Sequence, residues 1–250
     1  MSGPLAGVRV VVAGATGASG VAVAAALTAA GAAVVAVGSN DDHLKKAFGA
    51  DDGTAQPGVA TYRCDLADPE AVAQLAAAVR AEQGPVDGLI HLVGGWRGGK
   101  GIAGQTDEDW NFLQRNIVTT LRNTTRSFYP DLVASPRGRA AIVSATAVDS
   151  PTAGGANYAA AKAAAETWMR AVAQGFRKDQ TVPGNDGAAG SLRSAAVVFV
   201  VKALVDAGMR AADPERSFDG FTDVDDLAEA VRDLFTTDAA GLNGSRRKLA

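Results

Sequence analysis

Cysteine and histidine are scarce in this chain of 250 residues, which has one cysteine, Cys64, and two histidines, His43 and His91. A single cysteine excludes a disulfide within the chain, and so few soft ligands argue against a metal site built from histidine and cysteine. The sequence therefore predicts no metal centre. Because a protein without disulfides suits a reducing compartment, we expect a cytoplasmic location.

An excess of basic charge is also lacking. The chain has 24 lysines and arginines against 27 acidic residues, which gives a net charge of −3. Nothing in that balance favours a polyanion or an anionic membrane surface as a partner. We therefore expect a small-molecule substrate, and neither nucleic acid nor a membrane.

Charged residues are absent from residues 10–40, a stretch that could be mistaken for a membrane span or a signal peptide. Gly14, Gly17, Gly20 and Gly31 interrupt it, and the residues between them are mostly small. No basic segment leads into a compact apolar block. A buried strand, a turn, a helix and a second strand explain the stretch better.

Short β-branched runs alternate with alanine-rich stretches along the chain, a pattern that predicts a parallel sheet covered by helices. The expected fold is a single-domain α/β Rossmann fold, doubly wound, with a mostly parallel sheet and helices on both faces. Residues 1–250 are expected to form this one domain, although residues 248–250 resemble the start of a common expression-vector tail. Strands are expected at 9–13, 33–37, 61–64, 88–93, 140–144 and 195–201, and helices at 20–30, 69–83, 106–133, 157–176 and 224–236.

A glycine-rich turn, Ala-Gly-Ala-Thr-Gly-Ala-Ser-Gly at residues 13–20, follows the first expected strand. Glycines let a backbone turn tightly and approach a pyrophosphate, whose charge then lies against the N–H groups and dipole of the next helix. The same turn could join strand to helix with nothing bound, but its place directly after a strand favours a dinucleotide. The expected cofactor contacts in this turn are Gly14, Thr16, Gly17, Ala18, Ser19 and Gly20.

Two further turns are expected at the same edge of the sheet, where doubly wound folds bind their ligands. Asp65 and Leu66 follow the third expected strand, and Gly94 and Gly95 follow the fourth. Asp65 could accept a hydrogen bond from an adenine amino group, or it could cap the next helix. All four residues are included in the expected cofactor site.

Three motifs together resemble those of the short-chain dehydrogenase/reductase family, and the resemblance covers nearly the whole chain. The glycine turn matches at Gly14, Ala18 and Gly20, residues 92–95 occupy the family's Asn-Asn-Ala-Gly position, and residues 158–162 match its Tyr-x-x-x-Lys signature. The resemblance implies a nicotinamide-dependent oxidoreductase. It also implies a homodimer or homotetramer packed through the two long helices.

Within the family, the Gly-Gly-Trp element at residues 94–96 is most similar to that of the dihydropteridine reductases. This resemblance places Trp96 beside the substrate, stacked on a flat ring. An aromatic residue of a core or an interface would fit the sequence equally well.

Tyr158 and Lys162 lie four residues apart on an expected helix, so their side chains share one face. A neighbouring ammonium favours the phenolate, which predicts a phenol pKa below its ordinary value of about 10. Tyr158 is then expected to protonate the substrate as hydride arrives. The resemblance implies that Lys162 also binds the nicotinamide ribose and that Asn116 holds this lysine through water. The alternative is an ordinary exposed pair on an amphipathic helix.

Two positions depart from the family pattern. Ala145 stands where the family has a serine that hydrogen-bonds the reacting carbonyl, so Ser144 or Thr146 could replace it, or the site could work without a hydroxyl. A C=N or quinonoid substrate becomes plausible beside a ketone. Lys202 stands where the family has Pro-Gly, and it could bind an anionic group of the substrate or extend along the surface to solvent.

The choice of nicotinamide cofactor depends on the end of the second expected strand. An acid there holds the ribose 2′-hydroxyl of NAD, whereas the 2′-phosphate of NADP requires its absence. The residues are Gly38, Ser39 and Asn40, and the last two are donors suited to a phosphate, so NADP(H) is favoured over NAD(H). Asp41 and Asp42 follow directly without an arginine, which points the other way, as does the NADH use of the dihydropteridine reductases.

The sequence thus predicts an enzyme that transfers hydride from a nicotinamide to a C=O or C=N bond of a pterin-like molecule or a ketone. Tyr158 is the expected proton donor, assisted by Lys162. One alternative is a ketoreductase of secondary metabolism, which would need Ser144 or Thr146. The other is a non-catalytic NAD(P)-binding sensor, which would have no use for Tyr158 and Lys162.

Overall fold

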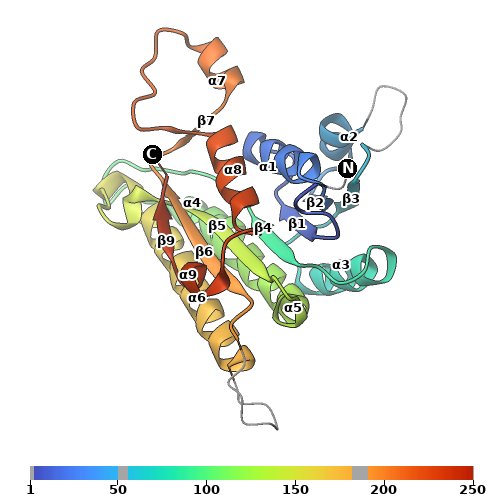
Figure 1. The fold of residues 1–250 in the computed structure, drawn as a ribbon. Helices are drawn as coiled ribbons and strands as arrows, with labels where there is room; N and C mark the ends of the chain where they lie inside the picture. Colours follow the sequence, from blue (N-terminus) through green and yellow to red (C-terminus); the bar gives the residue numbers. More distant parts are fainter. Residues whose placement is uncertain (1–2, 50–55, 182–190, 250) are drawn as a thin grey trace.

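A central parallel sheet organises the molecule (Figure 1). The computed structural model describes residues 3–49, 56–181 and 191–249. Within them, seven strands follow the order β3-β2-β1-β4-β5-β6-β9, and every pairing is parallel. The strands are β1 (Arg9–Ala13), β2 (Ala33–Gly38), β3 (Val59–Arg63), β4 (Gly88–His91), β5 (Arg139–Ala145), β6 (Ala195–Val201) and β9 (Arg246–Lys248). The predicted α/β Rossmann fold is confirmed.

Helices cover both faces of the sheet, and each face has its own hydrophobic core. On one face lie α1 (Ala18–Ala29), α2 (Asp41–Phe48), α8 (Val224–Asp233) and α9 (Ala239–Leu242). On the other lie α3 (Pro69–Glu82), α4 (Asp107–Leu113), the π-helical turn η1 (Gln114–Thr119), α5 (Thr120–Ala134) and α6 (Ala156–Gln180). A small lobe contains α7 (Ala207–Ala212) and the two-stranded pairing of β7 (Leu204–Val205) with β8 (Thr222–Asp223). Two 3₁₀ turns, η2 (Thr146–Val148) and η3 (Ala153–Gly155), precede α6.

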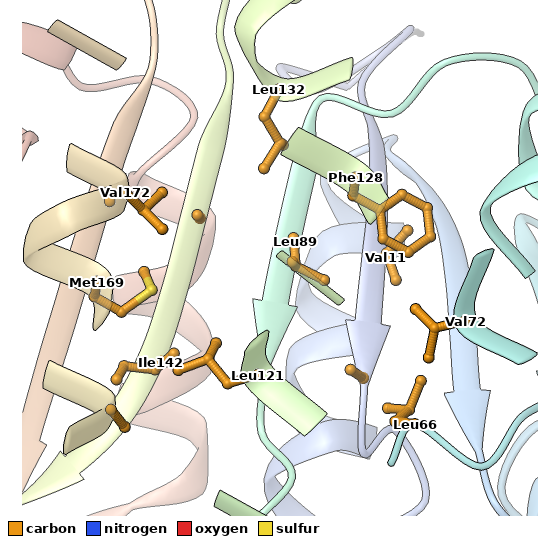
Figure 2. Packing of buried hydrophobic residues seen from close by; sticks show 14 of the residues in the cluster. Val11, Leu66, Val72, Leu89, Leu121, Phe128, Leu132, Ile142, Met169 and Val172 are labelled. Atoms are coloured by element: carbon orange, nitrogen blue, oxygen red, sulfur yellow. The ribbon is translucent and has the colours of Figure 1, made fainter. Parts of the chain in front are cut away.

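Uninterrupted apolar strands explain why the sheet is buried on both faces. In β1, Val11 faces one core while Val10 and Val12 face the other. Figure 2 shows Leu121, Phe128 and Leu132 of α5 packed over the sheet. The sheet is therefore a rigid platform for the residues at its carboxyl edge.

Local signals fix where several helices begin. Asp68 caps α3, its carboxylate accepting a hydrogen bond of 2.9 Å from the backbone N–H of Glu70, and Pro69 occupies the first turn. The hydroxyl of Thr106 caps α4 in the same way, accepting from Asp109 N–H at 3.1 Å. These caps set the helix starts that the sequence predicts there.

The structure differs from the sequence-based elements in several places. The helix expected at 106–133 is divided by the π-helical turn η1, and the strand expected at 88–93 ends at His91. The short polar helix α2 and the strand β9 were not predicted. Lys248, in the segment that resembles a vector tail, belongs to β9, and the backbone N–H of Leu249 donates to the carbonyl of Val200 at 2.9 Å.

No helix among the described residues combines the length and the apolarity needed to cross a bilayer.

Candidate active site

A cleft of about 860 Å³ opens at the carboxyl edge of the sheet. It lies over the carboxyl ends of β4, β5 and β6, beside the point between β1 and β4 where the strand order reverses and doubly wound sheets bind ligands. Segments that follow β4, β5 and β6 line it together with the start of α6. Among the predicted site residues it collects Ser19, Gly94, Gly95, Trp96, Ser144, Thr146, Tyr158, Lys162 and Lys202.

The glycine turn packs tightly against the end of β4. Gly14 has φ +81°, and a Cβ there would lie 3.0 Å from backbone atoms of Leu92 and Val93. A Cβ on Gly20 would lie 2.5 Å from the carbonyl oxygens of Gly14 and Ala15, so Gly20 serves helix packing. The predicted turn geometry is therefore present, with the backbone accessible where a side chain would not fit.

The first turn of α1 is suited to an anion. Its N-cap is Gly17, which supplies no capping side chain, and the first turn contains no acidic residue. The initial N–H groups of a helix lack partners within the helix, so a pyrophosphate there would receive both hydrogen bonds and a favourable dipole. The residues present fit the diphosphate of a nicotinamide dinucleotide.

A smaller cavity of about 130 Å³ continues from this turn towards β2 and β3, and Gly14, Thr16, Ser39, Leu66 and Asn116 are among its lining residues. Asp65 also lines it, but its carboxylate already accepts from Arg115 at 2.6 Å and from Ala67 N–H at 3.0 Å. The side chain of Leu66 is buried in the core.

Arg63 is a cation that the sequence reasoning missed. Parallel pairing of β2 with β3 aligns Gly38 with Arg63 and so brings the guanidinium to the end of the second strand. Its Nε lies 3.5 Å from the carbonyl oxygen of Ser39 and 3.8 Å from the carboxylate of Asp41. Asn40 at the same place caps α2, its Oδ1 accepting from His43 N–H at 3.0 Å.

Tyr158 and Lys162 lie on one face of α6 and line the same cleft. The ammonium of Lys162 lies 5.8 Å from the centre of the Tyr158 ring and donates to the carbonyl of Val143 at 2.8 Å. Burial lowers the pKa of Lys162 to about 8, although the nearby charge of Glu166 acts in the opposite direction. A Cβ on Gly94 would lie 3.7 Å from the lysine nitrogen, so the glycine keeps the approach to it open.

The predicted low pKa of Tyr158 is wrong. Burial raises the pKa of this phenol above its ordinary value of 10, because the cleft removes water from the phenolate. Loss of water around the phenolate thus outweighs its expected stabilisation by the Lys162 ammonium. Tyr158 therefore carries its proton at neutral pH.

The two hydroxyls that flank Ala145 differ in their surroundings. Ser144 is buried, and its Oγ donates to the carboxylate of Glu166 at 2.6 Å. Thr146 begins η2, is half-buried and lines the cleft, and its hydroxyl has no hydrogen-bond partner within the described part of the chain. Of the two, only Thr146 has a hydroxyl available to a ligand.

Asn116 lies in the π-helical turn η1, the kind of irregularity that often marks a functional site. The side-chain Nδ2 of Asn116 donates to the backbone carbonyl of Phe112 at 2.8 Å. The backbone carbonyl of Asn116 accepts a hydrogen bond from Thr120 Oγ1 at 2.7 Å. The same hydroxyl is 3.1 Å from Nε2 of His91, which the sequence reasoning also missed. A histidine within an apolar strand was the signal available for it.

The loop between β4 and α4 carries Trp96, whose exposed fraction is 67%. A Cβ on Gly98 would lie 2.6 Å from the indole, so Trp96 lies against this glycine. At the opposite side of the cleft, Lys202 donates to the carbonyl of Asp219 at 2.9 Å and lies 5.5 Å from the centre of the Phe221 ring. In this structure Lys202 is thus bound to the lobe around α7.

No group of three or more His, Cys, Asp or Glu side chains among the described residues could hold a metal ion.

Comparison with known proteins gives a family match over most of the chain. A family model for short chain dehydrogenases matches residues 8–195. An acetoacetyl-CoA reductase of Shinella zoogloeoides is 31% identical over 129 residues, which are 51% of this chain and 53% of that protein. The match spans about half the length of that relative.

Solved structures show the same fold. A protein assigned as a short chain dehydrogenase from Pseudomonas syringae has a TM-score of 0.80 at 24% identity, covering 99% of this chain and 98% of that one. The NADPH-bound structure of a short chain oxidoreductase from Pseudomonas aeruginosa PAO1, described as containing an atypical catalytic center, has a TM-score of 0.80 at 20% identity. That alignment covers 97% of this chain and 95% of the other.

Proposed function

The chain belongs to the short chain dehydrogenase family and is a nicotinamide-dependent oxidoreductase, and on this premise we propose that it uses NADPH to reduce a C=O or C=N bond of a flat, ring-containing small molecule. The observation that carries the proposal is the shared position of Tyr158 and Lys162 in one cleft of about 860 Å³. A merely exposed pair on a helix surface would not line a cavity.

Tyr158 is the proton donor in this proposal. Bound NADPH supplies hydride to the substrate, and the reduced heteroatom then needs a proton. Burial raises the pKa of Tyr158, so the phenol is protonated at neutral pH and can deliver that proton. The buried ammonium of Lys162 stabilises the phenolate that remains, because an opposite charge is worth more where water is excluded.

Thr146 is the hydroxyl we assign to hydrogen-bond the substrate heteroatom. The hydroxyl of Ser144 donates its proton to the carboxylate of Glu166, whereas Thr146 lines the cleft with a hydroxyl that can bind the substrate. The assignment moves the family's serine contact one residue along the chain from Ala145. Asn116 and Lys162 retain the supporting roles that the family resemblance implies.

Trp96 supports a flat substrate. An indole that is 67% exposed at the mouth of a cleft offers a stacking surface, and aromatic pairs favour offset stacking. This feature favours a pterin-like or quinonoid ring over an aliphatic ketone. The alignment with an acetoacetyl-CoA reductase supports testing a β-ketoacyl thioester beside them.

Replacement of Tyr158 by Phe tests the proposal. We expect Tyr158→Phe to lower kcat by about 100-fold or more, because general acid catalysis contributes on that scale, while the Kd for NADPH changes less than twofold. Turnover would be measured with quinonoid dihydropterin, a panel of small ketones and acetoacetyl-CoA. Tyr129→Phe is the matched control, because it removes a hydroxyl bonded at 2.8 Å to Asp179, which lies at the opposite end of α6 from Tyr158 and does not line the cleft.

Two results would count against this function. Retained turnover in Tyr158→Phe would remove the proton donor from the mechanism. Tight NADPH binding with no turnover of any member of the panel would favour the sensor alternative, whereas turnover of ketones alone would favour a ketoreductase.

The preference for NADPH is assigned to Arg63, together with Ser39 and Asn40. A guanidinium at the end of β2 can form a charge-assisted pair with a 2′-phosphate. We expect Arg63→Ala to weaken NADPH binding by about tenfold, the effect of losing one hydrogen bond to a charged group, and to leave the Kd for NADH within twofold. Titration of both nucleotides by fluorescence measures this, and equal weakening of both would show that Arg63 does not read the phosphate.

The cytoplasmic location and the homodimer or homotetramer implied by the family stay predictions. Light scattering of the purified protein measures the second.

A further inference from the structure

A chain of polar contacts runs from the buried Ser144 on β5, through the buried Glu166 on α6, to the exposed Arg246 on the edge strand β9. Glu166 lies at its centre, with a side chain that is 10% exposed. Its Oε1 accepts from Ser144 at 2.6 Å, and its Oε2 accepts from Nε of Arg246 at 2.9 Å. Nη1 of Arg246 in turn pairs with the carboxylate of Asp149 at 2.9 Å.

Glu166 lies one helical turn after Lys162 on α6, so the two side chains are neighbours on the same face. Lys162 is only 8% exposed, and it donates a hydrogen bond to a neutral carbonyl, that of Val143. No ion pair joins Lys162 to a carboxylate within the described residues, so its charge is offset across space. Glu166 is the group whose negative charge acts on it.

The other groups around Lys162 cannot take this part. His91 on β4 is buried and neutral, since burial lowers its pKa to about 3. Tyr158 on α6 keeps its proton, Ser144 on β5 is neutral, and Lys202 after β6 has the same sign as Lys162. Asp149 lies beyond Glu166 and is paired with Arg246. Among the described charged groups near the lysine, Glu166 alone is both buried and negative.

We propose that Glu166 is a positioning residue that keeps Lys162 protonated and in place. Ser144 and Arg246 fix its carboxylate, and the positive charge of Arg246 limits the effect of that carboxylate on Lys162, so that β9 is part of the machinery of the active site. The importance of this arrangement for catalysis rests on the proposed function, whereas the effect of Glu166 on Lys162 does not. A buried pair kept for stability alone is a weak explanation, because the cost of removing two charges from water often exceeds their attraction.

The two residues that bind the Glu166 carboxylate come from separate parts of the chain. Ser144 is 22 positions from Glu166, and Arg246 is 80 positions away. Strand β9 is exposed at all three of its residues, and its place in the sheet rests on parallel pairing with β6. Strand β9 has no buried side chain, so packing does not explain its sequence, whereas a role of Arg246 in binding Glu166 does.

The test is a titration of Lys162 in the protein without cofactor. The side-chain carbons of lysine are labelled, the Lys162 signal is assigned with Lys162→Met, and its midpoint is followed by NMR. We expect Glu166→Gln to lower the midpoint from its value of about 8 by about one unit, the low end of the effect of an opposite charge. We expect Arg246→Gln to raise it by about half a unit, because the carboxylate then acts on Lys162 alone.

Arg247→Gln is the matched control, since it removes the same charge from the adjacent position of β9. We expect no shift in this variant. General loosening of the structure would instead expose Lys162 and move its midpoint up towards 10.5 in both Glu166→Gln and Arg246→Gln, so a fall in the first is specific to the lost carboxylate.

An unchanged or raised midpoint in Glu166→Gln overturns the proposal, as does an equal shift in Arg246→Gln and Arg247→Gln. If Glu166→Gln does not fold, the two arginine variants still decide the matter, because a raised midpoint is expected in Arg246→Gln and an unchanged one in Arg247→Gln. Arg246 is one-third exposed, so we expect its replacement to leave the fold intact. The titration needs no turnover. Expected shifts in a protein that reduces nothing would therefore refute the proposed function and leave this inference standing.

Discussion

At the scale of single residues, His91 is held neutral by its burial, which is the main cause of its lowered pKa. Its Nε2 lies 3.1 Å from Thr120 Oγ1, and its Nδ1 lies 3.2 Å from Thr124 Oγ1. Both hydroxyls also donate to backbone carbonyls, Thr120 to that of Asn116 and Thr124 to that of Thr120. Both ring nitrogens therefore have a polar neighbour, but none of these neighbours is a carboxylate that would favour the charged ring.

This arrangement makes folding stability depend on pH. The pKa of His91 is about 3 when folded and near 6.5 when unfolded, so the unfolded state binds more protons between these values. The contribution to stability is complete above pH 6.5 and is lost as pH falls towards 3. We expect wild type to lose about 3 kcal/mol more than His91→Asn between pH 6.5 and pH 4, measured by urea unfolding.

His43→Asn is the control for this comparison, because His43 is exposed on α2. If wild type and His91→Asn lose the same stability on acidification, the buried imidazole does not titrate as described.

At the scale of elements, the loop between β4 and α4 is tied to the catalytic helix through Gln105. Its Nε2 donates to the carbonyls of Ala153 at 3.2 Å and Gly154 at 3.1 Å. Its Oε1 accepts from the backbone N–H of Asn157 at 3.2 Å, next to Tyr158. The loop that carries Trp96 and the helix that carries Tyr158 are therefore held by one side chain.

Gly99 permits this contact. A Cβ there would lie 2.5 Å from the carbonyl of Gly104 and 2.7 Å from Nε2 of Gln105. We expect Gly99→Ala to displace the loop and lower kcat/KM by about tenfold, since small misplacements of a site are costly, while the Kd for NADPH stays unchanged.

Gly241→Ala is the comparison variant for steady-state kinetics, because a Cβ at Gly241 would meet nothing within 4 Å. Equal kinetics for Gly99→Ala and wild type would show that the loop does not set the position of substrate.

Elements with a strong apolar pattern could be predicted from the sequence, and the others could not. The bounds of β1 and β6 match the sequence-based ranges because β-branched residues run through them without a break. Strand β9 consists of Arg246, Arg247 and Lys248, so no apolar signal announces it. The π-helical turn η1 interrupts a stretch for which the sequence predicts one continuous helix. The helix propensities of its residues do not indicate such a turn.

The features of the site also fall into those that the sequence predicts and those that it does not. The spacing of Tyr158 and Lys162 is local, and the sequence predicts their shared face. The engagement of Ser144 by Glu166 and the approach of Arg63 to Ser39 join positions 22 and 24 apart through sheet pairing and helix packing. Contacts of this kind depend on the tertiary structure, which no single-sequence pattern contains.

At the scale of the whole molecule, the order of the strands determines where chemistry is possible. The cleft lies at the ends of β4, β5 and β6, next to the point where the strand order reverses, and the cores on either face hold these strands in place. Substrate and cofactor residues therefore come from turns whose supports are rigid, while the exposed loop around Trp96 supplies the adaptable wall.

The strand order also has a consequence for how the protein is made. Synthesis proceeds from the N-terminus, so the ribosome adds Glu166 and all of β6 well before Arg246. In a nascent chain whose sheet lacks only β9, the carboxylate of Glu166 is bonded to Ser144 but has no arginine. Under the proposed role of Glu166, the charge around Lys162 thus reaches its final state only when β9, synthesised after the six other strands of the sheet, has docked on β6.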